Sequence, residues 1–175
     1  RYAINQGADW IARTDADCIV APTWTEVVRR ASPTAHMLGG KIRPRTDETA
    51  LTLLDQLVLP ATVELARFFG RVRPMNRSEG FLCPDVMCVG NNLAVEAKTY
   101  ADAGGFPRLA IEELSIPNDR ALVNQVRRCT PFVRYVPDMI VYNSIRRVRA
   151  YGLVRTLRWY LDHSLDHNRF EVDVR

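Results

Sequence analysis

Short apolar runs alternate along the chain with longer segments of helical periodicity. The run from Asp9 to Thr14 predicts a strand that stops at Asp15. Pro22 and Thr23 then begin a helix over Trp24 to Ala31, which Pro33 ends, and a second strand is expected near His36 to Arg43. The first third of the chain therefore predicts a strand, a helix and a strand.

The same alternation continues after residue 80. Gly104-Gly105 predicts the end of one helix, and Asn118 is a good N-cap for the next. The predicted elements are strand pieces Val86 to Val89 and Leu93 to Val95, a helix Glu96 to Ala103, a helix Asp119 to about Arg128, a strand Phe132 to Val136 and Met139 to Tyr142, interrupted by Pro137-Asp138, and a helix from about Val148 to His163. Strands alternating with helices predict a layered, Rossmann-like α/β fold with a mostly parallel sheet.

The most apolar segment runs from Leu51 to Phe69, and it carries Asp55, Pro60, Glu64 and Arg67. These residues exclude a spanning helix and predict an amphipathic helix, or a helix pair broken near the proline. Arginines 67, 71, 73 and 77 follow its apolar stripe. A core-facing helix is favoured, and peripheral contact with a membrane surface stays open.

Composition narrows the class of protein. The chain has 175 residues, 47% of them apolar and 25% charged, so it predicts one folded domain and excludes disordered and disulfide-scaffold classes. Its net charge of +4 does not by itself imply nucleic acid. Lys41 and Lys98 are the only lysines, so 22 of the 24 basic residues are arginine. Four cysteines without C-x-x-C spacing predict free thiols in a reducing, cytoplasmic compartment.

The first candidate chemistry is Asp15-Ala16-Asp17, at the end of the first predicted strand. Two carboxylates so close together repel each other unless a cation lies beside them. A divalent ion such as Mg2+ or Mn2+ would relieve that repulsion and could bridge to a diphosphate. Open α/β sheets bind ligands beyond the carboxyl ends of their strands, which is where this pair falls. Asp is also common in turns, so the pair alone is a weak signal.

Several further segments occur in a fixed order after the aspartates. They are Gly39-Gly40-Lys41-Ile42, Gly90-Asn91-Asn92-Leu93-Ala94-Val95, Ala103-Gly104-Gly105-Phe106, Asn118-Asp119 and Tyr135-Val136-Pro137-Asp138. With Asp15-Ala16-Asp17, this order resembles the family 2 glycosyltransferases of the GT-A fold. The resemblance implies a GT-A-like domain over residues 1–175, with 146–175 as an Arg-rich helical extension. It also implies that the amino-terminal nucleotide-binding part of the domain is missing, because few residues precede Asp15.

The resemblance also implies site residues. Asp15 and Asp17 would bind the diphosphate of a nucleotide-sugar through a divalent metal, and Asp119 would be the general base that deprotonates an acceptor hydroxyl. A carboxylate in the first turn of a helix suits that role, because the helix N-terminus stabilises its charge. Asn118 stands where the family usually has Glu, and it equally predicts a plain helix cap. Glu112 and Glu113 are alternative bases.

Three more candidates follow from the same comparison. The segment Gly90-Asn91-Asn92 permits close approach of a sugar and supplies amide groups, although it also suits a simple turn. Arg158 and Trp159 resemble part of the Q-x-x-R-W motif and could contact the diphosphate or stack on a sugar. Where the family often has a metal-binding His after the last strand, this chain has Asn143-Ser144.

The expected function is therefore metal-assisted, inverting transfer of a sugar from a nucleotide-diphosphate donor to a saccharide, lipid-linked or other hydroxyl acceptor, in the cytoplasm or at the inner face of the membrane. One alternative is a phosphatase of the haloacid dehalogenase type, in which Asp15 would be the nucleophile. A second is a non-catalytic, Arg-rich binding module, for which the sequence shows no basic patch interleaved with aromatic residues.

Overall fold

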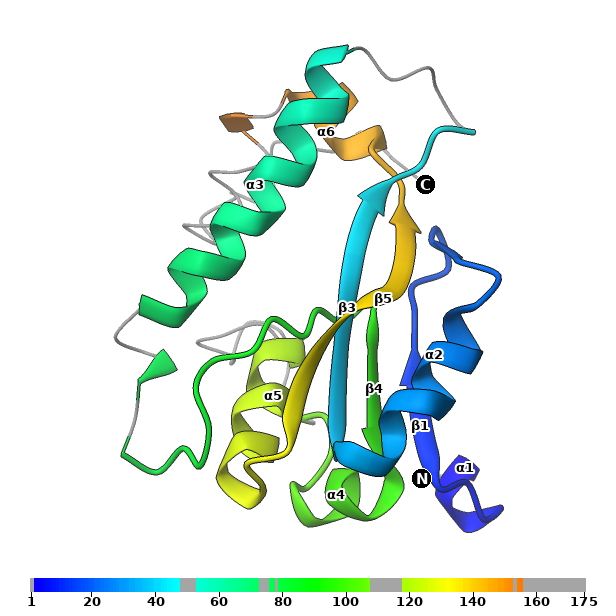
Figure 1. The fold of residues 1–175 in the computed structure, drawn as a ribbon, viewed down its shortest axis with the longest axis vertical. Coiled ribbons are helices and arrows are strands. Elements are labelled where there is room, and N and C mark those ends of the chain that lie inside the picture. The colour runs from blue at the N-terminus through cyan, green and yellow to red at the C-terminus, as the bar shows by residue number, and fades with distance from the viewer. Residues whose placement is uncertain are drawn as a thin grey trace.

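A computed structural model describes residues 2–47, 53–72, 76–77, 79–107, 118–152 and 154–155. The fold is mixed α/β, built on a curled sheet with helices beside it (Figure 1). Its strands are β1 (Trp10–Arg13), β2 (Ile19–Val20), β3 (Met37–Pro44), β4 (Leu93–Glu96) and β5 (Val133–Asn143). Its helices are α1 (Tyr2–Asn5), α2 (Trp24–Ala31), the 3-10 turn η1 (Ser32–Thr34), α3 (Leu53–Val72), α4 (Ala97–Asp102), α5 (Asn118–Cys129) and α6 (Arg146–Tyr151).

The sheet has the strand order β1-β4-β3-β5-β2, and the prediction that it is mostly parallel is wrong. Among the described strands, only β3 and β5 pair in parallel, whereas β4 is antiparallel to both β1 and β3, and β2 is antiparallel to β5. The alternation of strands and helices suggested parallel crossovers throughout. Instead, β4 enters the sheet in reverse, between two strands that run in the same direction.

Two apolar clusters hold the helices on opposite faces of the sheet. In β4, Leu93 and Val95 join the cluster under α5, while Ala94 joins the cluster under α2. Neighbouring β3 residues alternate in the same way, Met37 toward α5 and Leu38 toward α2. This period-two pattern of apolar side chains fixes the register of both strands, because a one-residue slip would exchange their faces.

Several predicted elements are confirmed. The first strand ends at Arg13, two residues before Asp15, and α2 covers the residues predicted for it. Gly104 and Gly105, both with positive φ, follow α4, and α5 begins at Asn118. The last strand continues through Pro137-Asp138 because a register shift opposite Gly40 and Lys41 accommodates the extra residues.

Other predictions differ from the structure. Residues 86–88 form no strand, and Val89 makes only an isolated bridge with Asn92. The final helix begins earlier than predicted, at Arg146, and Gly152 follows its last residue with a φ of 78°. The part of that prediction beyond residue 155, including the candidates Arg158 and Trp159, lies outside the described residues, as do Glu112 and Glu113.

The apolar segment after β3 forms one helix, α3, which contains Pro60 in its interior. The alternative of a helix pair broken at this proline is therefore wrong. In the described part of the chain, none of the helices is both long and apolar enough to cross a membrane. α3 lies along one side of the molecule, beside the sheet (Figure 1).

Candidate functional site

Strand direction brings distant segments of the chain to one edge of the sheet. β1, β3 and β5 run the same way, so their carboxyl ends share that edge, and the antiparallel β4 begins there, with Leu93 opposite Arg13. α5 precedes β5 through a short connection and runs back against it, which brings its first residues, Asn118 and Asp119, to the same place. The topology therefore places the ends of several elements around one opening.

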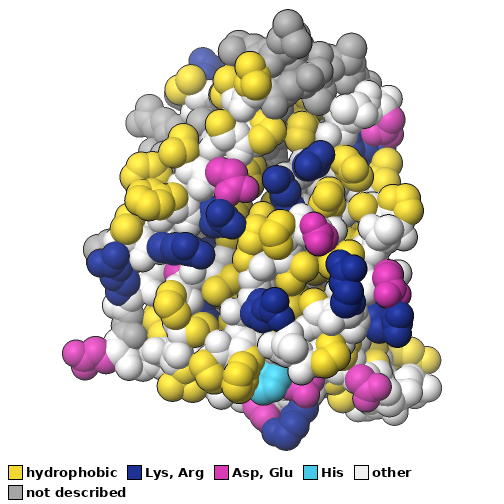
Figure 2. Space-filling view, viewed as in Figure 1, with side chains coloured by type: hydrophobic (Ala, Val, Ile, Leu, Met, Phe, Trp, Pro, Cys, Tyr) yellow, Lys and Arg dark blue, Asp and Glu magenta, His cyan; other side chains and the backbone are white. Residues whose placement is uncertain are grey.

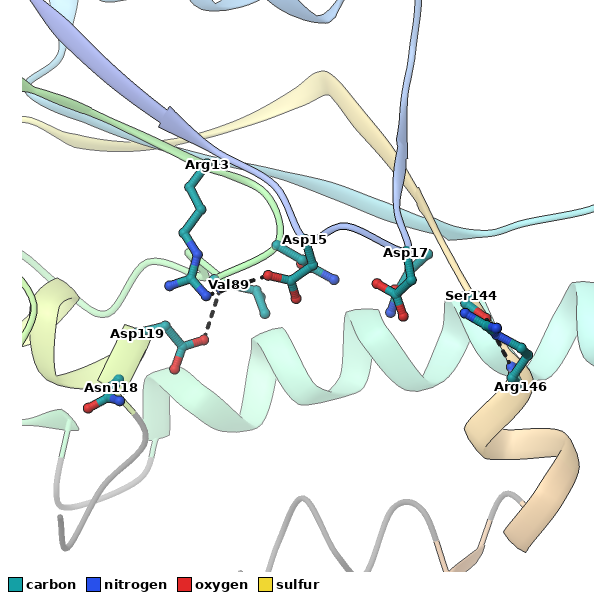
Figure 3. Close-up of a pocket in the computed structure, with 11 residues that line it drawn as sticks. Arg13, Asp15, Asp17, Val89, Asn118, Asp119, Ser144 and Arg146 are labelled. Atoms are coloured by element: carbon teal, nitrogen blue, oxygen red, sulfur yellow. Dashed lines mark hydrogen bonds and ion pairs between the residues drawn. The ribbon is translucent and has the colours of Figure 1, made fainter. Parts of the chain in front are cut away.

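A pocket of about 330 Å³ opens at this edge (Figure 3). Of the eight residues predicted from the sequence to form the site, five line this pocket: Asp15, Asp17, Gly90, Asn91 and Asp119. The described residues that complete its lining are Arg13, Val89, Asn118, Asn143, Ser144 and Arg146. Residues separated by more than a hundred positions in the sequence thus share one cavity.

The loop that carries the two aspartates is fixed by contacts with later parts of the chain. The Cys18 N–H donates to the Asp15 carbonyl over 3.1 Å, and Arg45 donates to the Asp17 carbonyl over 2.9 Å. The Cys18 thiol donates to Oδ1 of Asn143 over 3.3 Å. Burial, and next the Asp17 carboxylate, raise the pKa of the Cys18 thiol, which keeps it protonated at neutral pH. The Asp15 carboxylate lies 3.5 Å from the Arg13 guanidinium, and Oδ1 of Asp17 lies 3.7 Å from the Cys18 thiol.

Asp119 is held more tightly, by two backbone donors. Its Oδ2 accepts from the Gly90 N–H over 2.9 Å, and its Oδ1 accepts from the Arg120 N–H over 2.8 Å. A Cβ on residue 90 would lie 3.3 Å from the Asp119 Cβ, which is tighter than most real contacts. Glycine therefore fits this position better than a residue with a side chain. The loop before β4 therefore orients the carboxylate at the start of α5.

Arg13 is a pocket residue that the sequence analysis did not identify. It ends β1, and Figure 3 shows its side chain between those of Asp15 and Asp119. Its guanidinium lies 3.5 Å from the Asp15 carboxylate and 4.9 Å from the centre of the Phe106 ring. The available signal was its place two residues before Asp15, since strand residues i and i+2 lie on the same face.

Asn92 is close to the pocket in sequence but does not line it in the structure. It is fully buried, and its amide oxygen accepts from Nε1 of Trp24 over 2.9 Å. Its amide nitrogen donates to the carbonyls of Lys41 and Met139 over 2.9 and 2.8 Å. These bonds join α2, β3 and β5 at the register shift, so Asn92 has a structural role.

Asn91 and Asn118 each bury an amide oxygen that accepts no hydrogen bond in the described part of the chain. Asn91 is only 7% exposed, and both residues line the pocket. A buried acceptor without a donor is costly, and in native proteins it usually marks a bound water or ligand. Both side chains belong to the pocket lining, so the pocket offers amide groups to a ligand that carries hydroxyl or N–H groups.

The pocket could hold a divalent cation only with help from a ligand. Among the described residues, no three His, Cys, Asp or Glu side chains are grouped as metal ligands. Mg2+, however, is commonly bound by one or two carboxylates together with substrate phosphates and waters. Asp15 and Asp17 supply two such carboxylates in the same pocket, and this donor set fits a metal that arrives with a phosphorylated ligand.

Comparison with known proteins gives no independent assignment. No protein-family model matches the chain, and a search of curated proteins finds no significant match. The functional argument therefore rests on the residues and the pocket.

Proposed function

We propose that the chain is a metal-assisted glycosyltransferase with a GT-A-like fold, which moves a sugar from a nucleotide-diphosphate donor to a hydroxyl acceptor with inversion. The observation that carries this proposal is that Asp15, Asp17 and Asp119 line one pocket although more than a hundred positions separate Asp119 from the other two. The motif order in the sequence assigns these three residues their roles, and the shared pocket supports that assignment.

The charge of the pocket supports the choice of ligand. Its described lining holds three carboxylates, Asp15, Asp17 and Asp119, and two guanidiniums, Arg13 and Arg146, so its formal charge is −1. One divalent cation changes this charge to +1, which favours a diphosphate. Arg13 and Arg146 can then donate directly to phosphate oxygens, a geometry for which guanidinium is well suited. Metal and diphosphate are therefore expected to bind together, and each weakly alone.

Each polar group has a defined part in the transfer. The acceptor oxygen forms a bond to the anomeric carbon while the bond from that carbon to the diphosphate breaks on the opposite face, its electron pair leaving with the phosphate oxygen. Asp119 takes the proton of the acceptor hydroxyl. The metal held by Asp15 and Asp17 would neutralise charge on the leaving diphosphate. Asn91 and Asn118 supply amide groups to the pocket lining, and such groups can hydrogen-bond to sugar hydroxyls.

The test separates binding from chemistry. The full chain is mixed with Mn2+ and a panel of nucleotide-diphosphate sugars, and the right donor raises the melting temperature, because a ligand that binds only the folded state stabilises it by about 2.7 kcal/mol at 100 times its Kd. Asp17→Ala should abolish this metal-dependent shift. Asp119→Asn should keep the shift and lower sugar transfer by about 10²- to 10⁴-fold.

Asp102→Asn is the matched control. Asp102 pairs with Lys98 on α4, outside the pocket lining, and its substitution should change neither reading. Sugar transfer that survives both Asp17→Ala and Asp119→Asn would contradict the mechanism. Orthophosphate released from a phosphorylated substrate, in a reaction that depends on Asp15 and needs no nucleotide-sugar, would instead support the phosphatase alternative.

A further inference from the structure

The outer face of α3 is apolar over most of the helix length. Its exposed residues include Leu57, Ala61, Leu65, Phe68 and Val72, spaced by four, four, three and four positions, with Phe69 beside them. At 3.6 residues per turn, this spacing places them on one face, and at 1.5 Å per residue the stripe is about 22 Å long. We call these six residues the α3 stripe.

The opposite face of α3 carries the contacts with the rest of the molecule. Arg67 lies over the ring of Tyr135, 4.7 Å from its centre, and pairs with Glu64 over 3.0 Å. Glu64 is thus neutralised within the helix. Arg67 on this side of α3 contacts β5, while the residues of the α3 stripe are exposed to solvent.

Basic side chains lie at the carboxyl end of the α3 stripe. At its carboxyl end, Arg71 is exposed, and the exposed Arg77 donates to the Arg71 carbonyl over 3.1 Å. Figure 2 shows apolar side chains along this part of the molecule with basic side chains beside them.

We propose that the α3 stripe binds the surface of an anionic lipid membrane, with α3 lying in the plane of the interface. An apolar face bordered by arginines matches the two layers of such a surface, acyl chains beneath anionic headgroups. The edge-to-face pair of Phe68 and Phe69 supplies the aromatic groups that favour the interface. α3 is too polar to span the bilayer, so it is expected to lie on it. This inference is independent of the proposed chemistry.

The experiment is co-sedimentation of the full chain with vesicles of phosphatidylcholine alone and with added phosphatidylglycerol. We expect binding to the anionic vesicles only, weakened by salt because exposed charges are screened. The triple variant Leu57→Gln, Leu65→Gln, Phe68→Gln should reduce the vesicle affinity at least about tenfold. Arg71→Gln with Arg77→Gln should reduce it by about fivefold or more and flatten the salt dependence.

Leu82→Gln is the matched control, since Leu82 is 55% exposed and Leu65 is 56% exposed, and only Leu65 lies on α3. It should bind vesicles like the parent. Equal binding to neutral and anionic vesicles, or no binding to either, overturns the proposal. So does a dimer in sedimentation analysis that the triple variant abolishes, because the stripe would then be covered by a second copy of the chain. Binding that appears only after residues 156–175 are deleted overturns it as well, since that segment would be the occupant.

Discussion

Two groups of charged side chains near Asp119 differ in how exposed and how completely paired they are. In the pocket, Arg13 and Asp15 are 41% and 48% exposed and their charged atoms are 3.5 Å apart. In the segment before β4, Asp85 is 3% exposed and pairs with both Arg120 and Arg127. The first group is open and incompletely paired, whereas the second is closed and saturated.

Arg127 shows how complete the second group is. This guanidinium is 1% exposed, lies 4.0 Å from the centre of the Phe81 ring, and donates to the carbonyls of Cys83 and Asn76 over 2.9 and 3.0 Å. Every one of these partners belongs to residues 76–85, so one buried cation fixes that segment against α5. Charges that are buried and fully paired indicate a structural role, and charges left open to solvent in a cavity indicate a role with a ligand.

Among the substitutions that test this difference between the two groups, Asp85→Ala is expected to lower the free energy of unfolding the most. It leaves Arg127 buried without its carboxylate, and removing one partner of a buried pair costs about 3–5 kcal/mol. Urea unfolding should therefore show a large fall in the free energy of unfolding. The control is Asp15→Ala in the pocket, where an exposed pair contributes at most about 1 kcal/mol. Similar losses in the two variants would show that the two groups do not differ.

Alkaline pH offers a second way to sharpen the comparison. Burial raises the pKa of the Cys88 thiol from 9.0 to about 12, and Cys88 lies in the core under α5. Because the folded pKa is the higher one, the stabilisation is complete below pH 9 and is lost as the pH rises from 9 toward 12. The expected slope is at most about 1.4 kcal/mol per pH unit.

Cys88→Ala should remove this part of the slope, whatever its own cost at neutral pH. The measurement is urea unfolding at several pH values between about 8 and 11, a range in which the thiol of the unfolded chain ionises and that of the folded chain stays largely protonated. If the parent and the variant lose stability in parallel, the Cys88 thiol is not the group that titrates, and burial around it is weaker than the structure shows.

The smallest effect on stability is expected from Gly90→Ala, at the boundary between the two groups. The added Cβ would meet the Asp119 Cβ at 3.3 Å, so α5 or the loop must shift by a few tenths of an ångström. We expect a loss of about 1 kcal/mol or less in unfolding free energy, but a fall of roughly tenfold in sugar transfer, because Asp119 moves. Gly39→Ala, in the core, should show the opposite balance, with the larger effect on the unfolding free energy and the smaller one on sugar transfer. Its Cβ would lie 2.3 Å from the Met87 carbonyl oxygen. An unchanged transfer rate in Gly90→Ala would show that its contact with Asp119 is not needed.

Local signals predicted the local features of the fold. Pro22, Thr23 and Pro33 bracket α2, and Gly104-Gly105 follow α4, because turn and cap chemistry acts over a few residues. The two-residue strand β2 had no such signal, since Ile19 and Val20 form a strand only by pairing with β5. The direction of β4 could not be predicted either, because an apolar run has the same pattern whichever way the strand runs.

The residues of the candidate site also divide into those that the sequence predicted and those that it did not. Asp15, Asp17, Gly90, Asn91 and Asp119 could be predicted because their residue types and order carry chemical meaning. Arg13, Val89 and Arg146 were not predicted, because their place in the pocket depends on the pairing of β1 with β4 and on the length of β5. Asn92 was predicted beside Asn91, yet the alternation of side chains turns it toward the core.

The bond between the Cys18 thiol and Asn143 also has a consequence for how the protein is made. These two residues are 125 positions apart, and β5, which carries Asn143, also pairs with β2. A ribosome adds about 5–20 residues per second, so roughly 6–25 s separate their synthesis. During that interval the aspartate loop has no partner strand beside it. The pocket is therefore completed late in translation, and a chain that stalls before β5 carries Asp15 and Asp17 without the residues after β5 that complete the pocket lining.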